Sequence, residues 1–396
     1  MYVQQKQHLK HRNSFEKIIP KAKLILKEYD LCDNCVGRLF VKNSGFTSNK
    51  LLGKRIKNTL KKNPISKCYI CKNIFSNLPS YIAKMLQVSR GYQYSTFLIG
   101  AKLQPSIIDR DDSLRSKFKL RGIDSVKTDI TQQLAKSFAR KTKIKIDYHR
   151  PDLAFTIDFK NDISELSIRP LIFFGRYTKN VRGIPQKQTK CPSCLGKGCF
   201  SCSFHGISEF TSVEGRISQF LFKKFGGTQA KITWIGGEDK SSLVNGNGRP
   251  FFVKLLSPKK RKLRLKKNYL QKEIDIKNLR ITDEIPNVPL QFRSKVKLSV
   301  TTQNKIWTKD IKRLQKLKKT PILVLENGRK KTQKFIYEIK PRKKSPKSFS
   351  LKLTLDGGLP LKRFVEGNDV HPNLTKFLQN QCKCNEFDFQ DVKLLN

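Results

Sequence analysis

Apolar residues recur at helical spacing in the first half of the chain. Ile130, Leu134 and Phe138 are four residues apart and share one face of a predicted helix, which Asp129 is expected to cap. Upstream, a basic leader over residues 1–24 runs into a second predicted helix near residues 20–28. From about residue 73, helical spacing gives way to strand-like alternation, so an α/β arrangement is expected there.

A further helix is predicted directly after Ser212, because serine is a favoured N-cap residue. Its apolar face comprises Val213, Ile217, Phe220 and Leu221. Two lysines follow in the last turn, where positive charge is favourable, and a Gly-Gly pair at residues 226–227 ends the helix.

Strands are predicted over residues 143–148 and 153–159, where apolar and polar residues alternate, and over the apolar segment 167–174. Short apolar segments predict further strands at residues 230–235, 249–256, 296–300, 321–325, 335–339 and 349–355. With few helices between them, these strands predict an α+β fold with a large, mostly antiparallel sheet.

The changes of pattern along the chain predict four parts. These are an N-terminal helix with the first cysteine pairs over residues 1–72, a domain over 73–190, a cysteine knuckle over 191–205, and a domain over 206–396.

The chain of 396 residues contains 82 Lys and Arg against 31 Asp and Glu, so its formal net charge is +51. Hydrophobic residues make up 37%, enough for packed cores rather than a disordered basic tail. This excess of positive charge argues against an enzyme for small neutral or cationic metabolites and favours a polyanionic partner, above all nucleic acid. A general bias toward lysine is the alternative explanation.

The first residues are polar and basic, without the apolar core of a signal peptide. No apolar run approaches the roughly 18–20 residues that cross a bilayer. We therefore expect a cytoplasmic protein with no membrane partner.

Eight of the ten cysteines occur as Cys-x-x-Cys pairs. In a reducing compartment this spacing favours zinc over disulfides, because a tight turn directs both sulfurs at one ion. We expect two four-cysteine sites, one formed by Cys32, Cys35, Cys68 and Cys71, and one by Cys191, Cys194, Cys199 and Cys202. Four thiolates leave no open position, so the one or two Zn²⁺ would be structural. Buried reduced thiols are the alternative, and Cys382 and Cys384 are expected to be ordinary thiols.

The segment WIGGEDKSSLVNGNGRPFFVKL carries the acidic pair Glu238-Asp239 at the end of a predicted strand, with glycines on both sides. Glycine allows a ligand or another backbone to approach closely. In such a basic chain, a carboxylate framed by glycines is a candidate catalytic group. An ordinary turn between two strands would show the same pattern.

This segment is similar to the catalytic segment of the archaeal and eukaryotic tRNA pseudouridine synthases of the TΨC loop, the tenth class of pseudouridine synthases. That family carries Gly-Arg-Glu-Asp followed by Gly-x-Gly-Arg-Pro-Phe, which residues 246–251 match. Other segments agree in the same order, namely LCDNCVGRLF, FFGRYTKNVRGIPQ, KKTPILVL and GGLPLKRFVEGNDVHPNL. The resemblance extends over about residues 25–390.

The resemblance implies a zinc-bearing, THUMP-like RNA-binding region followed by a pseudouridine synthase catalytic domain. It implies isomerisation of uridine to pseudouridine at the adjacent tRNA positions 54 and 55, with Asp239 as the nucleophile. The expected partner is the TΨC arm of tRNA, bound by a monomer without a catalytic or nucleotide cofactor. The target nucleotide must be flipped out of its loop, which costs roughly a few kcal/mol.

The same motifs suggest further site residues. Leu361 and Lys362 match an apolar wall and a cation of the family's site. Lys240 or Arg249 is a candidate substitute for the arginine that the family places beside its nucleophile. Tyr337 is a candidate for the contact with the base, with a place in the core or on the sheet surface as the alternative.

Three cations of the segment GRYTKNVRG are candidate phosphate ligands, with a solvated basic face as the alternative reading: Arg176, Lys179 and Arg182. Two family residues are replaced in this chain. The arginine before Glu-Asp is Gly237, and the tyrosine expected at the base is Pro360.

These two replacements support an alternative function, a tRNA-binding folding chaperone of the same fold that has lost catalysis. The retained Asp239 and Gly-x-Gly-Arg-Pro-Phe segment favour the enzyme. A methyltransferase or thiouridine synthase would need a Gly-rich nucleotide loop before a helix or an ATP loop, whereas residues 246–248 precede a strand.

Overall fold

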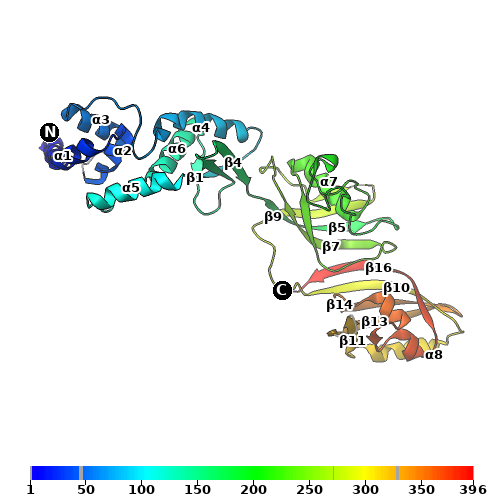
Figure 1. The fold of residues 1–396 in the computed structure, drawn as a ribbon. Helices are drawn as coiled ribbons and strands as arrows, with labels where there is room; N and C mark the ends of the chain where they lie inside the picture. The colour runs from blue at the N-terminus through cyan, green and yellow to red at the C-terminus, as the bar shows by residue number, and fades with distance from the viewer. Residues whose placement is uncertain (1, 44–47, 271, 327–329, 396) are drawn as a thin grey trace. The chain divides into compact units, whose positions relative to one another are not determined.

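The computed structural model describes residues 2–43, 48–270, 272–326 and 330–395. The chain divides into two compact units, Met1–Arg169 and Pro170–Asn396, each with its own hydrophobic core (Figure 1). The predicted boundary at residue 190 therefore lies inside the second unit, which also contains the cysteine segment 191–205. Within the described ranges, no helix has the length and apolar character needed to cross a membrane.

The first unit combines helices with a small sheet. The helices are α1 (Tyr2–Glu28), α2 (Asp33–Arg38), α3 (Asn49–Thr59), α4 (Ile74–Val88), α5 (Pro105–Lys117) and α6 (Val126–Thr142), with a 3-10 turn, η1 (Val41–Asn43). The strands are β1 (Thr96–Lys102), β2 (Lys145–Ile146), β3 (Leu153–Asp158) and β4 (Ile163–Ile168), in the order β2-β1-β3-β4. β1 is parallel to β2 and β3, whereas β3 and β4 are antiparallel.

Helix α6 packs on this sheet through three aromatic rings. The ring of Phe138 lies 4.8 Å from that of Phe97 on β1 and 5.1 Å from that of Phe155 on β3. All three side chains are buried, together with Ile130 and Leu134 of the predicted apolar face. The prediction of this helical face is confirmed.

The start of α6 differs from the prediction. The N-cap is Ser125, whose Oγ accepts a hydrogen bond from the backbone N–H of Thr128 at 3.1 Å. The predicted cap, Asp129, is wrong, because the helix begins a turn earlier, at Val126. Asp129 lies in the first turn, and its carboxylate accepts hydrogen bonds from side chains of other turns and helices.

The apolar segment 167–174 is not one strand, as predicted, but two. β4 ends at Ile168, and β5 (Leu171–Lys179) begins after Arg169-Pro170, in the second unit. Proline has no N–H to donate to a strand ladder, so it favours a break at this point.

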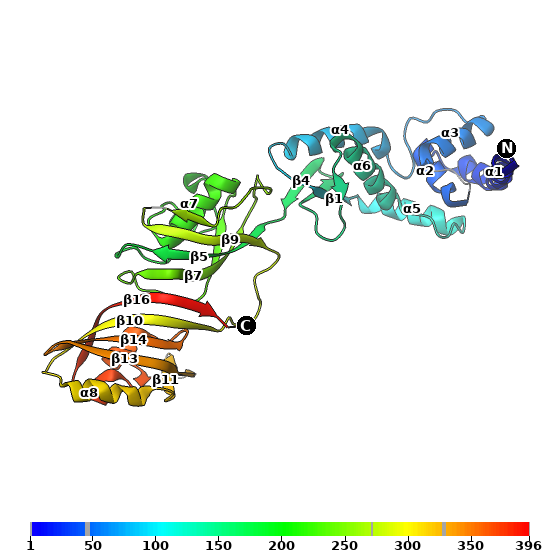
Figure 2. The same cartoon turned by 180° about the vertical axis from the view of Figure 1, so that it is seen from behind.

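The second unit is built on a nine-stranded sheet with the order β13-β14-β10-β16-β7-β5-β9-β8, and β6 also pairs with β7 (Figures 1 and 2). Besides β5, its strands are β6 (Ala230–Trp234), β7 (Val244–Leu255), β8 (Asn268–Leu270), β9 (Ile274–Thr282), β10 (Phe292–Thr302), β13 (Ile336–Ser345), β14 (Ser348–Asp356) and β16 (Cys382–Leu394). Only the β16–β7 pair among these described strands is parallel. The predicted α+β class with a large, mostly antiparallel sheet is confirmed.

A smaller sheet and several short helices complete this unit. β11 (Ile322–Glu326) pairs with β12 (Lys330–Lys334) and with β15 (Val370–His371). The helices are α7 (Val213–Phe225), α8 (Thr308–Arg313), α9 (Leu361–Glu366) and α10 (Leu374–Leu378), with the 3-10 turns η2 (Phe200–Cys202) and η3 (Leu314–Leu317).

Helix α7 begins and ends as predicted. Ser212 caps it by accepting a hydrogen bond from the N–H of Gly215 at 2.9 Å, and Gly226 ends it in the left-handed conformation, with φ of 70°. Its last residue, Phe225, lies 4.8 Å from the ring of Phe173 on β5. This contact fixes the helix on the sheet.

Strand β7 changes neighbours along its length, and this change positions the loop before it. Residues 251–255 pair with β6 on one side and with β5 on the other. On the edge of β7 that β6 occupies farther along, Val244 at the start of β7 pairs with Phe389 of β16. The loop over residues 235–243 thus leaves the sheet where β6 ends and returns where β16 joins the same edge of β7.

Because Ser125 caps α6, we expect Ser125→Ala to destabilise the start of this helix. Loss of the capping oxygen should lower the local free energy of opening of the first turn of α6 by about 1 kcal/mol. Amide hydrogen exchange of α6 measures this change. Ser125→Thr keeps a capping hydroxyl and should exchange nearly as wild type does; equal exchange in Ser125→Ala and wild type would contradict the assignment of the cap.

Candidate active site

Two glycine-containing loops of the second unit meet at the ring of Phe292. A Cβ atom on Gly236 would lie 2.5 Å from this ring, and a Cβ atom on Gly357 would lie 2.4 Å from it. Gly236 also has φ of +77°, which favours glycine. The loop that carries Asp239 and the loop that leads to α9 can therefore approach the same ring closely.

This approach brings Asp239 and Lys362 together. Lys362 Nζ donates a hydrogen bond to Asp239 Oδ2 at 2.8 Å, and the two side chains are 43% and 30% exposed. Ser241 donates to the other oxygen, Oδ1, from its backbone N–H at 2.9 Å and from its hydroxyl at 2.6 Å. The carboxylate is oriented through both oxygens and remains partly open to solvent.

The environment keeps the Asp239 carboxyl ionised. Partial burial alone would raise its pKa, but the hydrogen bonds from Lys362 and Ser241 outweigh burial and lower the pKa to about 2. The same hydrogen bond raises the pKa of Lys362. At neutral pH the pair is a full carboxylate beside a full ammonium group.

The preceding acid, Glu238, has the opposite environment, because its side chain is completely buried. Its carboxylate accepts a hydrogen bond from the hydroxyl of Tyr177 at 2.9 Å. Lys179 Nζ lies 3.3 Å from one oxygen, and Arg249 Nε lies 3.6 Å from the other. The guanidinium of Arg249 also stacks on the ring of Phe389, 4.0 Å from its centre.

This cluster determines the path of the loop. Removing one partner from a buried ion pair typically costs about 3–5 kcal/mol, because the remaining charge is left in a poorly solvating interior. Glu238 must therefore stay where its cations are. The one carboxylate of Glu238 faces two cations, so this buried cluster next to Asp239 carries an excess of positive charge.

Lys179 also holds the main chain of the loop. Its Nζ donates to the carbonyl oxygens of Asp239 at 3.0 Å and Ile184 at 3.1 Å. The side chain is 0% exposed, so its ammonium is not accessible to a phosphate in this structure. The pKa of Lys179 is lowered by burial, and the charge of Glu238 opposes this effect.

The other two candidate phosphate ligands also contact protein groups. Arg176 donates to the carbonyl oxygens of Asn247 and Gly248, each at 2.8 Å. Arg182 binds Asp388 of β16 with two hydrogen bonds, at 2.8 and 3.0 Å, and also donates to the carbonyl oxygen of Ser241. The Arg182 side chain is 35% exposed, so part of it faces solvent.

The remaining predicted site residues lie along the second loop and the strands beside it. Leu361 is 5% exposed and packs in the core at the start of α9, next to Lys362. Tyr337 on β13 donates its hydroxyl to Asp356 at 2.9 Å, and Arg293 lies 3.9 Å above its ring. Asp356 ends β14, directly before this loop.

Both family replacements fall beside the Asp239–Lys362 pair. A Cβ atom on Gly237 would meet only one atom among the described residues within 4 Å, Gln186 Oε1 at 3.9 Å, so the position has room for a side chain. Pro360 precedes α9 as its N-cap, with φ of −74°. It starts the helix that presents Lys362.

Sequence reasoning missed several residues that build this site. Ser241, two residues after an aspartate, has the spacing of an Asx turn, and this signal was available in the sequence. Tyr177 donates its hydroxyl to Glu238, and Gln186 in turn donates to this hydroxyl at 3.1 Å. They lie in the segment that carries the family resemblance, but no local pattern connects them with Glu238.

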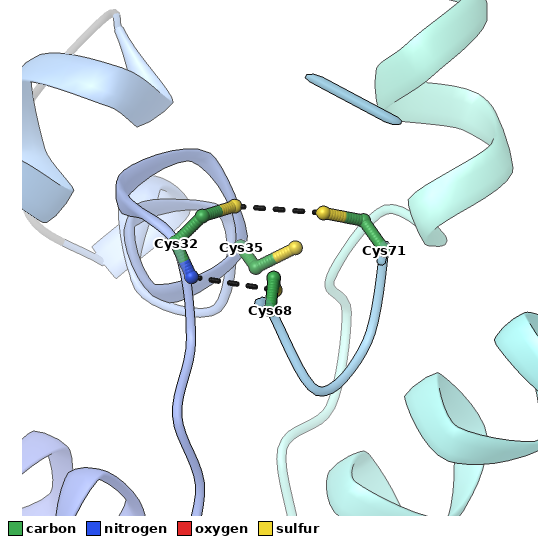
Figure 3. A group of neighbouring side chains, drawn as sticks. All are labelled: Cys32, Cys35, Cys68 and Cys71. Atoms are coloured by element: carbon green, nitrogen blue, oxygen red, sulfur yellow. Dashed lines mark hydrogen bonds between the residues drawn. The ribbon is translucent and has the colours of Figure 1, made fainter. Parts of the chain in front are cut away.

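The eight paired cysteines form the two predicted clusters of four. Within each cluster, the four sulfur atoms lie within 4.8 Å of one another. Figure 3 shows the first cluster, in which Cys32 and Cys35 face Cys68 and Cys71 from separate segments. Cys382 and Cys384 are buried on β16 and belong to neither cluster.

The geometry of both clusters fits a tetrahedral metal. A Zn–S bond of about 2.3 Å gives sulfur–sulfur edges of about 3.8 Å in a tetrahedron. The distances are 3.6 Å for Cys32–Cys71, 4.0 Å for Cys191–Cys199 and 3.9 Å for Cys194–Cys202. These distances are far from the roughly 2.05 Å of a disulfide.

Backbone N–H groups point at sulfur in the second cluster, as suits thiolates. Cys202 Sγ accepts from the N–H of Cys199 at 3.3 Å and of Gly206 at 3.2 Å. The bond from Cys199 contributes most to a pKa of Cys202 lowered to about 6. His205, near this cluster in sequence, stacks on the ring of Phe222, and its Nδ1 lies 2.7 Å from the carbonyl oxygen of Thr228.

Comparison with known proteins identifies relatives of both units. A family model described as "Pus10, C-terminal" matches residues 172–393, and one described as "Pus10 THUMP domain, archaeal" matches residues 81–158. The tRNA pseudouridine synthase Pus10 of Nitrosopumilus maritimus is 51% identical over 381 residues, covering 96% of this chain and 99% of its own. The proteins of the same name from Cenarchaeum symbiosum and Pyrococcus furiosus are 35% and 29% identical, covering 92% and 95% of this chain and 90% and 98% of theirs.

The ion pair predicts how Asp239 titrates. Lys362→Met removes the largest of the hydrogen bonds that lower the pKa of Asp239, while burial and the two hydrogen bonds from Ser241 remain, so this pKa should rise from about 2 toward its usual 3.8. The native carboxylate therefore stays charged as the pH falls to about 2, whereas the variant carboxylate is neutralised at a higher pH. Carbon-13 NMR of the carboxyl group measures both titrations.

Lys240→Met is the matched control for this titration, since Lys240 is an exposed neighbour in sequence. It removes the same charge and should move the pKa of Asp239 much less. Equal shifts in the two variants would contradict a specific role of Lys362.

Proposed function

The chain belongs to the Pus10 family, and we propose that it isomerises uridine to pseudouridine in tRNA with Asp239 as the nucleophile. The observation that carries this proposal is a single carboxylate that is ionised, held through both oxygens and still partly exposed. An ionised carboxylate is the group that covalent catalysis at a nucleoside requires.

The reaction breaks the bond between C1′ of the ribose and N1 of the base and forms a bond between C1′ and C5. The base loses the proton on C5 and gains one on N1, so substrate and product have the same composition and no redox cofactor is needed. Asp239 takes part in detaching the base, Ser241 fixes the rotamer of its carboxylate, and Lys362 keeps it charged. Leu361 would form an apolar wall beside the base.

Arg249 and Lys179 would contribute indirectly, through the loop that carries Asp239. Both bind the buried Glu238, and the net positive charge of this cluster favours the anionic form of the adjacent Asp239. This charge compensates in part for the family arginine that is Gly237 here. We propose positioning roles for these residues and a contact with the flipped nucleotide for Tyr337, which lies beside the loop of Lys362.

For the substrate, we propose the TΨC arm of tRNA with its adjacent uridines 54 and 55, bound by one copy of the chain in the cytoplasm. The net charge of +51 suits a tRNA backbone, and Arg182 keeps an exposed face for a phosphate. The catalytic domain would have the pseudouridine synthase fold. A chaperone without catalysis is less well supported, because it would not need an oriented and ionised Asp239.

We propose that each four-cysteine cluster binds one structural Zn²⁺. The two segments of the first cluster are far apart in sequence, so the metal would link the N-terminal helices to the segment before α4. With four thiolates the coordination sphere is closed, and the ion takes no part in the reaction.

The catalytic proposal predicts that Asp239→Asn lowers the rate of pseudouridine formation by at least about 10³-fold, a loss typical for a nucleophile. Binding of an unmodified tRNA transcript should change less than about twofold, because the overall charge is almost unchanged. Chemical mapping of pseudouridine and a filter-binding assay give the two values. Asp369→Asn, an exposed aspartate paired with Arg363, should keep full activity. Pseudouridine formed equally by wild type and Asp239→Asn would exclude the nucleophile, and its absence from both would favour the chaperone.

The metal proposal predicts about two zinc ions per chain in the purified protein. Cys68→Ser should reduce this to about one, while Cys382→Ser, at a buried cysteine outside both clusters, should leave two. Elemental analysis measures the ratio. A folded, zinc-free wild-type chain would contradict both assignments.

A further inference from the structure

The first unit contains a cleft of about 450 Å³ that the proposed reaction does not use. It is lined by residues of α2, α3 and α6 and of the segments beside them. This volume is within the range of about 300–1,000 Å³ that small-ligand pockets occupy. Except for Val41, the residues that line it are polar or charged, which argues against an apolar ligand.

Two buried charged groups line this cleft with unused hydrogen-bonding capacity. Asp129 is 4% exposed; its Oδ1 accepts from Asn49 at 2.8 Å and from Gln133 at 3.0 Å, while its Oδ2 has no partner among the described residues. Arg38 is 1% exposed; its guanidinium pairs with the buried Asp111 and donates to the carbonyl oxygen of Asp124 at 2.7 Å, while its Nε has no partner within the described ranges.

Unpartnered buried groups of this kind require an explanation. A buried donor or acceptor without a partner costs about 1–3 kcal/mol, and more when it is charged. Asp129 offers an acceptor and Arg38 a donor, and both residues line this one cleft. A ligand with both N–H or O–H groups and acceptor atoms would satisfy them. A nucleobase and a ribose each present such groups.

The rim of the cleft is cationic. Lys50 lies on α3, and Lys136 and Arg140 lie on successive turns of α6, all exposed. Three cations exceed what the single phosphate of a free nucleotide needs. They match a chain with phosphates on both sides of one bound nucleotide.

We propose that this cleft binds a single unpaired nucleotide of an RNA chain, with its base or ribose at Asp129 and Arg38 and its neighbouring phosphates at the rim. This site goes beyond the proposed function, because it lies in the first unit and needs no group of the Asp239 loop. It adds directional recognition to a surface whose charge alone binds RNA without discrimination.

The rim is tested by Lys136→Ala/Arg140→Ala against the control Lys127→Ala/Lys141→Ala. Both pairs lie on α6 and remove the same charge, but the control residues do not line the cleft. The dissociation constant for an unmodified tRNA transcript, measured by fluorescence anisotropy, should rise about tenfold or more in the rim variant and less than about threefold in the control. Equal effects of the two double variants would overturn the proposal.

The role of the buried Asp129 is tested by Asp129→Asn. This variant keeps an acceptor for Asn49 and Gln133 but turns the unpartnered oxygen into a donor. Affinity for the tRNA transcript should fall about fivefold or more, while affinity for a blunt, fully paired RNA duplex of similar length should stay within about twofold. A parallel loss for both RNAs, or for neither, would overturn the proposal. The rim variant, at exposed positions, keeps the test valid if Asp129→Asn does not fold.

A free nucleotide presents the same groups as a nucleotide of an RNA chain and is the alternative ligand for this cleft. AMP, CMP, GMP and UMP at millimolar concentration should not displace the transcript from wild type. Mononucleotide binding that the rim variant abolishes, together with unchanged affinity for tRNA, would overturn the RNA assignment. All readouts are binding constants, so they can be repeated in Asp239→Asn, and a failure of the catalytic proposal stays distinguishable from a failure of this one.

Discussion

The burial of Glu238 is the constraint on which the catalytic loop depends. A carboxylate with no exposed surface is tolerated because Tyr177, Lys179 and Arg249 surround it within 2.9–3.6 Å. The three partners come from β5 and β7, the two strands that pair with each other beneath the loop. Any other path of the loop would leave either Glu238 or its cations unpaired inside the protein, at a cost of several kcal/mol.

Two adjacent acids therefore have separate tasks. Glu238 points inward and anchors the loop, which leaves Asp239 directed toward Lys362 and solvent. A lysine in the first turn of α9 is unfavourable for the helix dipole, so its position there is explained by its partner rather than by helix stability. The close contact of Gly236 and Gly357 with Phe292 allows the two loops to approach within the 2.8 Å of that ion pair.

Features set by local spacing could be predicted from the sequence, whereas most contacts between distant side chains could not; the first cysteine cluster, which joins two separate Cys-x-x-Cys pairs, is an exception. The Cys-x-x-Cys pairs, the cap of α7 at Ser212 and the sheet class follow from local spacing, and the structure confirms them. Lys179 has a partner 59 residues away, so its local sequence indicates a phosphate ligand or a solvated cation although its side chain is completely buried. The single strand predicted over residues 167–174 missed the break at Pro170, since apolar character continues across the boundary of the two units.

The distribution of cations has a consequence for RNA recognition. The three cations of the GRYTKNVRG segment all donate to protein carbonyl or carboxylate groups, so they contribute to the architecture of the loop whatever else they bind. Most of the net charge of +51 must act elsewhere, and dispersed lysines attract every nucleic acid alike. Discrimination of one RNA from another therefore requires groups with fixed direction and unused hydrogen-bonding capacity. In the first unit, Asp129 and Arg38 have both properties.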